Sequence, residues 1–189
     1  MKIGVVSDTH GYFDPRLPQL LGGVTEILHA GDVGSPQVLE QLRAIAPVQA
    51  VRGNVDAPSL GLPPTLTRRY DRVEIHMLHA LPRPQSVLRD WAKAAPLEGK
   101  QAEHCERFLR TFPEECQVVI FGHSHEPCLQ LLAGKLFFNP GGAGKKRFSL
   151  PRCCGLLEFA PQGVRATFLS PERYNEDLPG DVWLPVGGS

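Results

Sequence analysis

The stretch EILHAGDVGSPQVLEQLRAIAPVQAV, residues 26–51, holds a strand, a helix and a second strand in succession. Residues 26–29 and 48–51 are short apolar segments of the type that forms buried strands. Between them, Ser35 is placed to cap a helix that Pro36 begins, and the apolar side chains that follow recur on one helical face. Because the connection is long enough for a helical crossover, this stretch predicts two parallel strands whose sheet is covered by the helix.

The same alternation extends to both sides of this unit. Residues 3–6 are a first apolar strand, and the helix after it is expected to have Asp14 as its N-cap and Pro15 as its first residue. Downstream, a proline-rich loop at 57–67 precedes a strand at 73–78. This order of strands and helices predicts an α/β fold built on a parallel sheet.

The second half of the chain changes character. Residues 84–112 carry two apolar helical stripes, which Pro96 and Gly99 separate, and they form either a lid over a site or a cover for a sheet. An apolar strand follows at 118–121. The last third contains short strands joined by turns with glycine and proline, which predicts an antiparallel meander, and the segment from Ser170 onward is expected to be a surface tail.

Composition limits the class of protein. The chain has 189 residues, with 20 basic and 20 acidic side chains, so its balanced charge gives no electrostatic reason to expect a nucleic-acid or membrane-surface partner. No apolar run is long enough for a membrane span or a signal peptide. Five cysteines without C-x-x-C spacing argue against a disulfide framework. We therefore expect a cytoplasmic protein with reduced thiols and a single domain over 1–189, with its core at about 1–169 and its tail at 170–189.

Polar side chains follow the expected strands at the point where each strand ends. They comprise two aspartates, one asparagine and four histidines: Asp8, His10, Asp32, Asn54, His79, His123 and His125. Because the carboxyl ends of parallel strands meet at one edge of a sheet, these residues are expected to form a common ligand site.

The chemistry of this set favours metal ions. Seven nitrogen and oxygen donors exceed the needs of one four-coordinate zinc, and they suit two divalent cations roughly 3.5–4 Å apart. Two dications, two aspartates and one bridging hydroxide leave a small positive charge, which favours an anionic phosphate ester as the substrate.

The motifs also resemble those of a known family. Five motifs occur here in the order typical of the calcineurin-like metallophosphoesterase superfamily: D-x-H, G-D, G-N-x-D, a lone histidine at a strand end and G-H-x-H. Four longer stretches are similar to those of the small phosphodiesterases of the YfcE type: HAGDV (29–33), GNVD (53–56), FGHSHEP (121–127) and NPGGAGKKRF (139–148). The resemblance spans about residues 3–160 and implies a β-sandwich of two mixed sheets flanked by helices, in α-β-β-α layers.

The resemblance also implies roles for the polar residues. The first metal ion would be held by Asp8, His10 and His125, the second by Asn54, His79 and His123, with Asp32 bridging the two. Manganese is expected ahead of iron, nickel or zinc. A hydroxide that bridges the metals would attack a phosphodiester, with Asn54 and His79 as catalytic residues and Asn54 also binding the substrate phosphate.

Three departures from the family pattern stand out. Val55 replaces the histidine that many relatives have after the asparagine, so we expect activated phosphodiesters to be cleaved faster than alkyl phosphomonoesters. Ala80 and Gly142 stand where relatives usually have glycine and serine. The expected partner is a small phosphate-ester substrate, with no nucleic-acid or membrane partner, and a homo-oligomeric state is left open.

Several alternatives stay open at this level. A non-catalytic protein-interaction scaffold is the competing function, as in the retromer subunit of this fold, which lacks part of the histidine set that is complete here. The basic segment 144–147 either attracts a phosphate ester or is a solvated loop. His29 is a candidate for orienting a metal ligand. His76 and His104 are expected to be structural or solvent-facing.

Overall fold

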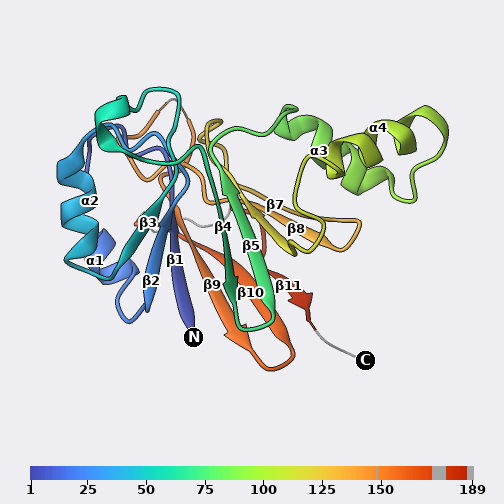
Figure 1. Ribbon diagram of the computed structural model, residues 1–189. Helices are drawn as coiled ribbons and strands as arrows, with labels where there is room; N and C mark the ends of the chain where they lie inside the picture. The colour runs from blue at the N-terminus through green and yellow to red at the C-terminus, as the bar shows by residue number, and fades with distance from the viewer. Residues whose placement is uncertain (148, 172–177, 187–189) are drawn as a thin grey trace.

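The computed structural model describes residues 1–147, 149–171 and 178–186. Two β-sheets lie face to face, and helices cover the outer face of each (Figure 1). The expected α-β-β-α sandwich of two mixed sheets is confirmed.

The first sheet has the strand order β11-β10-β9-β1-β2-β3. Its parallel part contains β1 (Lys2–Val6), β2 (Glu26–His29) and β3 (Val48–Ala50). Its antiparallel part contains β9 (Cys154–Ala160), β10 (Gly163–Leu169) and β11 (Val182–Pro185). The strand–helix–strand unit predicted at residues 26–51 is therefore present, and it fixes the parallel half of this sheet.

The second sheet has the order β4-β5-β6-β8-β7. Its centre is parallel and contains β5 (Val73–Leu78), β6 (Val118–Ile120) and β8 (Lys135–Asn139). Its two edges, β4 (Thr65–Tyr70) and β7 (Cys128–Leu132), are antiparallel to their neighbours. Parallel strands thus occur in both sheets.

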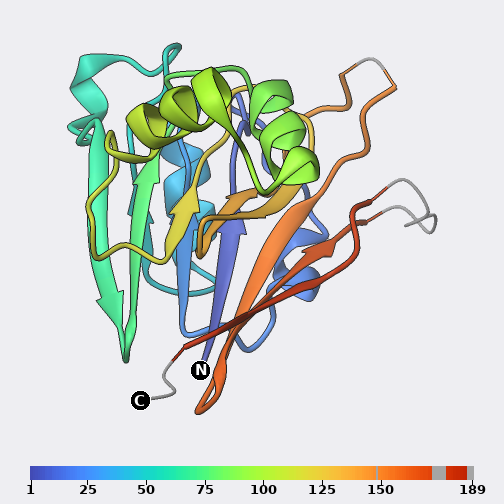
Figure 2. The ribbon, with the colours of Figure 1, turned by 90° about the vertical axis from the view of Figure 1, so that its right-hand side faces the viewer.

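Helices complete the outer layers, as Figures 1 and 2 show from two sides. The first sheet is covered by α1 (Leu17–Leu20) and α2 (Pro36–Arg43), and the second by α3 (Gln85–Ala94) and α4 (Gly99–Leu109). A short 3₁₀ helix, η1, spans Pro58–Leu60. Among the described residues no helix is long and apolar enough to cross a lipid bilayer.

Three apolar clusters correspond to these layers. The central cluster lies between the sheets and includes Val5, Ile120 and Phe138, all fully buried. A second cluster packs α1 and α2 on the first sheet, and a third packs α3 and α4 on the second. The five cysteines are all buried: Cys105, Cys116, Cys128, Cys153 and Cys154.

The segment 84–112 serves as a cover for the second sheet. Trp91 of α3 and Phe108 of α4 have ring centroids 5.4 Å apart, and Phe108 lies 5.6 Å from Phe137 of β8. These contacts bury the apolar stripes that the sequence places on the two helices. Only the first residues of the segment, 84–86, reach the cavity described below.

The start of the first helix was predicted wrongly, and that of the second correctly except for its capping hydrogen bond. Asp14 and Pro15 precede the first helix, since α1 starts only at Leu17 with Arg16 as its N-cap, and the Asp14 carboxylate accepts hydrogen bonds from the backbone N–H and guanidinium of Arg16. Ser35 occupies the N-cap position of α2, but its side chain makes no capping hydrogen bond.

Three expectations about strands were also wrong. The proline-rich loop ends earlier than predicted, because Thr65 begins β4, an edge strand whose mostly exposed side chains give no apolar run. The last third is not one meander, since β7 and β8 join the second sheet while β9 and β10 join the first. The segment after Ser170 is more than a surface tail, because β11 pairs with β10 and buries Leu184.

Candidate metal centre

All seven residues predicted as metal ligands lie in loops that follow parallel strands. Asp8 and His10 follow β1, and Asp32 follows β2. Asn54 follows β3, His79 follows β5, and His123 and His125 follow β6. The structure brings these loops together at one edge of the sandwich, as the side-chain distances below show.

One group comprises Asp8, His10 and His125. The Nε2 atoms of His10 and His125 are 3.1 Å apart. Asp8 Oδ1 lies 3.5 Å from His125 Nε2 and 3.9 Å from His10 Nε2. Two imidazoles and one carboxylate therefore converge on one point, as ligands of a cation do.

A second group surrounds Asn54. Its Oδ1 lies 3.0 Å from His79 Nε2 and 3.0 Å from His123 Nδ1. Asp32 stands between the two groups, since its Oδ2 is 3.3 Å from His79 Nε2 and 3.6 Å from His10 Nε2. The carboxylate of Asp32 thus faces both clusters.

The donors in this arrangement fit cations. Asp8 Oδ1 is buried and has no hydrogen-bond partner among the described residues. Burial raises the pKa of this carboxyl to about 6, although the Ser7 hydroxyl donates to its other oxygen at 2.6 Å. A buried carboxylate oxygen without a partner is costly, and a cation beside Oδ1 would offset that cost.

The tautomer of His79 points to the same conclusion. Its Nδ1 lies 2.8 Å from the carbonyl oxygen of Ala30, so Nδ1 carries the proton. The lone pair of a neutral ring is then on Nε2, which faces the oxygens of Asn54 and Asp32. A lone pair aimed at two acceptor oxygens is repulsive unless a proton or a cation lies between them.

The other ionisable groups suit the same chemistry. Burial would raise the pKa of Asp32, but His79, when its ring is protonated on both nitrogens, and the Val55 backbone N–H donate hydrogen bonds that outweigh burial and lower this pKa to about 2. Burial, followed by the charge of Arg147, lowers the pKa of His125 to about 4 and also lowers that of His10. At neutral pH both imidazoles therefore keep a lone pair free to bind a cation.

The backbone is unusual at five of the seven positions. Asp8, His10, Asp32, His123 and His125 all have φ between 47° and 71°. Non-glycine residues seldom adopt this left-handed conformation, and clusters of such residues occur at functional sites. The left-handed turns aim successive side chains in different directions, so His123 reaches Asn54 while His125 reaches Asp8.

Two glycines are required by close packing around the carboxylates. A Cβ on Gly122 would lie 2.0 Å from Ser7 Oγ and 2.7 Å from Asp8 Oδ2. A Cβ on Gly53 would lie 2.1 Å from the backbone N and the Oδ1 of Asp32. Glycine at position 122 therefore makes room for Ser7 and Asp8.

Sequence reasoning gave no role to Asp56, the last residue of the G-N-V-D motif. Its two carboxylate oxygens accept hydrogen bonds from the backbone N–H groups of Gly34 and Gly53, each at 2.8 Å. Asp56 thereby ties the loop that carries Asp32 to the loop that carries Asn54. The position of Asp56 in the G-N-V-D motif is the sequence feature that could have indicated this role.

The remaining histidines support the fold. His29 accepts from the Gly31 N–H through Nδ1 and bonds Thr9 Oγ1 through Nε2, so it braces two loops, and both of these hydrogen bonds go to groups other than the predicted ligand side chains. His76 is buried and bonds Thr67 Oγ1 at 2.8 Å, as expected of a structural residue. His104 is exposed on α4.

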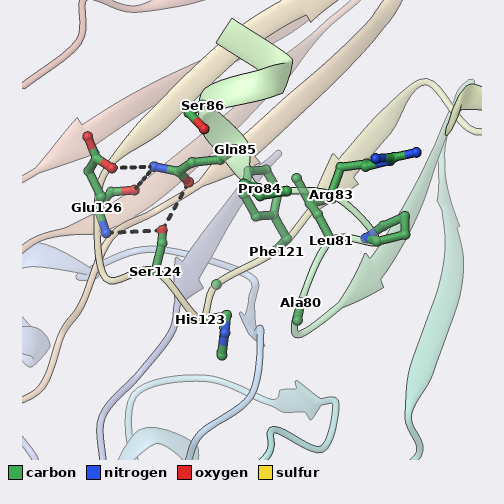
Figure 3. A pocket seen from close by; sticks show the side chains of 12 residues that line it. Ala80, Leu81, Arg83, Pro84, Gln85, Ser86, Phe121, His123, Ser124 and Glu126 are labelled. Carbon is green, nitrogen blue, oxygen red and sulfur yellow. Dashed lines mark hydrogen bonds between the residues drawn. The ribbon is translucent and has the colours of Figure 1, made fainter. Parts of the chain in front are cut away.

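Two cavities adjoin the site and share Ala80 and His123. One, of about 590 Å³, is lined by Asn54 and His79 as well as Arg52. The other, of about 570 Å³, is lined by residues 80–86 and 121–124 together with Glu126 (Figure 3). Space for substituents thus exists on more than one side of His123.

Comparison with known proteins agrees with this geometry. Residues 1–161 match the model of the calcineurin-like phosphoesterase superfamily domain. A probable metallophosphoesterase of Methanocaldococcus jannaschii is 32% identical over 162 residues, which cover 81% of this chain and 71% of that protein. A phosphodiesterase of the same organism is 27% identical over 167 residues, covering 85% of this chain and 89% of that protein.

A solved structure shows the same architecture. Vps29 from Entamoeba histolytica is 20% identical, with a TM-score of 0.68 over 97% of this chain and 99% of that one. At this identity the likeness concerns the fold alone.

Proposed function

Because the chain belongs to the calcineurin-like phosphoesterase superfamily, we propose that it is a metal-dependent phosphodiesterase with a dinuclear centre. The observation that carries this proposal is the position of Asp32, whose Oδ2 lies 3.6 Å from His10 and 3.3 Å from His79, between two groups of nitrogen and oxygen donors. One carboxylate shared by two such groups is suited to two adjacent divalent cations.

Each group would hold one ion. Asp8, His10 and His125 would bind the first, and Asn54, His79 and His123 the second, with Asp32 common to both. When bound, two divalent cations lower the pKa of water and neutralise charge on the reacting phosphate. Manganese is proposed ahead of iron, nickel or zinc, since imidazole and carboxylate accept all four.

The protein's own groups would position the phosphate ester. Asn54 is exposed, and its Oδ1 is directed at His79 and His123, which leaves its amide N–H groups free to donate to a phosphate oxygen. His79 is fixed by the Ala30 carbonyl, so its Nε2 keeps one direction during turnover. Both residues are proposed as catalytic residues on this basis.

The preference for diesters has a steric basis. A diester carries two substituents on phosphorus, and the two cavities that share His123 and Ala80 offer room for both. Val55, 51% exposed beside Asn54, supplies no proton to a poor leaving group. Activated diesters are therefore the proposed substrates, and the proposed location is the cytoplasm.

The test compares hydrolysis of bis(p-nitrophenyl) phosphate with that of p-nitrophenyl phosphate after metal loading. We expect the diester to be cleaved faster, and Asp32→Ala and His123→Ala to lose at least about a hundredfold in kcat. His104→Ala, which changes an exposed histidine of α4, is the matched control. Undiminished turnover in both site variants would rule out the proposed centre.

The competing scaffold function predicts a different result. Metal-loaded protein of normal fold that hydrolyses neither ester would favour a non-catalytic interaction protein. The complete set of seven donors supports the enzyme instead.

A further inference from the structure

The cavity of about 570 Å³ beside His123 has the size of a small-molecule site. Its walls come from residues 80–86, which follow β5, and from 121–124 and Glu126, which follow β6. Of the seven predicted metal ligands, only His123 lines it. It therefore adjoins the proposed centre without being part of it.

The cavity wall carries one positively charged side chain, Arg83, that is available to a ligand. Arg83 is exposed and makes no ion pair or side-chain hydrogen bond within the described part of the chain. The one carboxylate on the walls, Glu126, is already paired with Arg89 at 2.6 Å and accepts from Gln85 Nε2 at 2.9 Å. The first turn of α3 carries no acidic residue. The guanidinium of Arg83 is thus left free for a ligand.

The polar groups of Gln85, Ser124 and Glu126 are bonded to one another or to neighbouring residues. Gln85 is only 8% exposed, and its Oε1 accepts from Ser124 Oγ at 3.0 Å and from Asn139 Nδ2 at 3.2 Å. Its Nε2 donates to the carbonyl and the carboxylate of Glu126 (Figure 3). These bonds tie the two walls together, so the cavity is held in shape before a ligand arrives.

The side chains between the two ends are apolar. In Figure 3, Arg83 and His123 stand on opposite sides of the drawn group, with Leu81 and Phe121 between them. A ligand that spans this distance needs an uncharged organic part beside Leu81 and an anionic group at Arg83.

Building on the proposed phosphodiesterase function, we infer that this cavity binds one ester arm of the substrate and that Arg83 selects an arm carrying a second anionic group, such as a further phosphate. Arg83 is then a specificity-determining residue. The scissile phosphate lies at the metal centre, and the second phosphate lies one ester arm away.

The test uses two substrates that differ by one phosphate: the p-nitrophenyl ester of thymidine 5′-phosphate, and the same ester with an added 3′-phosphate. With the full chain and Mn²⁺, we expect kcat/KM to be at least about tenfold higher for the substrate with the added phosphate, as one charge-assisted contact implies. Arg83→Ala should reduce this preference to within about twofold and leave kcat/KM for the simpler ester nearly unchanged. Arg43→Ala, an exposed arginine at the end of α2, should keep the full preference.

A binding measurement separates this inference from the proposed function. Calorimetry of the Mn²⁺-loaded protein should show tighter binding of thymidine 3′,5′-bisphosphate than of thymidine 5′-phosphate, and Arg83→Ala should abolish the difference. If this holds without hydrolysis of either ester, the subsite stands and the phosphodiesterase proposal fails. Equal affinities and equal kcat/KM in the wild type, or a preference that survives in Arg83→Ala, would overturn the subsite.

Discussion

Replacing Gly122 with alanine tests how tightly the centre is packed. The added Cβ would lie 2.0 Å from Ser7 Oγ and 2.7 Å from Asp8 Oδ2, far inside van der Waals contact. The backbone cannot move away, because the Gly122 N–H donates to the His79 carbonyl at 2.9 Å and its own carbonyl accepts from Asn139 Nδ2 at 2.9 Å. Ser7 and Asp8 must therefore shift.

The cost follows from what that shift breaks. Overpacking a rigid site costs about 1–3 kcal/mol. The Ser7 hydroxyl and the His123 N–H donate to Asp8 Oδ2 at 2.6 and 3.1 Å, and each hydrogen bond to a charged group is worth about 1.5–3 kcal/mol. If one of them is lost, the free energy of unfolding falls by about 2.5–6 kcal/mol. This is a large part of the roughly 5–15 kcal/mol by which proteins are usually stable.

The assay is urea unfolding of the metal-free protein, followed by Mn²⁺ titration of the folded variant. Gly180→Ala is the control, because no described atom lies within 4 Å of its added Cβ. Ser7→Ala combined with Gly122→Ala should be less destabilised than the sum of the two single changes, because the 2.0 Å contact is gone. A Gly122→Ala protein within about 0.5 kcal/mol of wild type and with normal Mn²⁺ affinity would refute the reasoning.

Three further changes have definite expected outcomes. Asp56→Ala should lower the free energy of unfolding by about 2–4 kcal/mol and weaken ion binding, because two backbone N–H groups lose their acceptor; a change below about 0.5 kcal/mol would contradict this role. His29 is fully buried and its pKa is lowered to about 4, so on acidification the unfolded chain takes up a proton at His29 before the folded chain does. The free energy of unfolding should therefore fall by about 2–3 kcal/mol as pH drops from 7 to 4. His29→Gln should flatten this pH dependence of the free energy of unfolding, and an unchanged dependence would argue against the role of His29. Trp91→Ala should cost about 3–5 kcal/mol in urea unfolding without changing Mn²⁺ affinity, whereas Trp183→Ala, at 37% exposure, should cost much less; altered affinity in Trp91→Ala would mean that α3 does more than cover the sheet.

The parallel part of the fold can be predicted from the sequence because several local sequence patterns indicate the same structure there. Apolar runs, Pro36 at the start of α2 and polar residues directly after each strand all indicate the same strand–helix–strand order. The sequence therefore predicts that Asp8 and Asp32 lie at one edge of the sheet. What brings them into contact is the topology that parallel strands impose.

The features that were missed depend on long-range contacts. β4 is an edge strand of mostly exposed residues and has no local apolar pattern. β11 is a short apolar run, but it follows a long polar segment, and its pairing with β10 is not a local feature. The last strands are divided between two sheets according to the strands with which they pair. These partners can be distant in the sequence: β9 pairs with β1, which lies 100 or more residues before it. The left-handed conformation of Asp8 and His125 is held by the surrounding packing, which no local motif reveals.

The central claim is that the two donor groups hold two cations with Asp32 between them. Anomalous diffraction from crystals soaked in Mn²⁺ tests this directly. We expect two peaks roughly 3.5–4 Å apart, one among Asp8, His10 and His125 and the other among Asn54, His79 and His123. Peaks elsewhere, or no peak near Asp32 at saturating Mn²⁺, would contradict it.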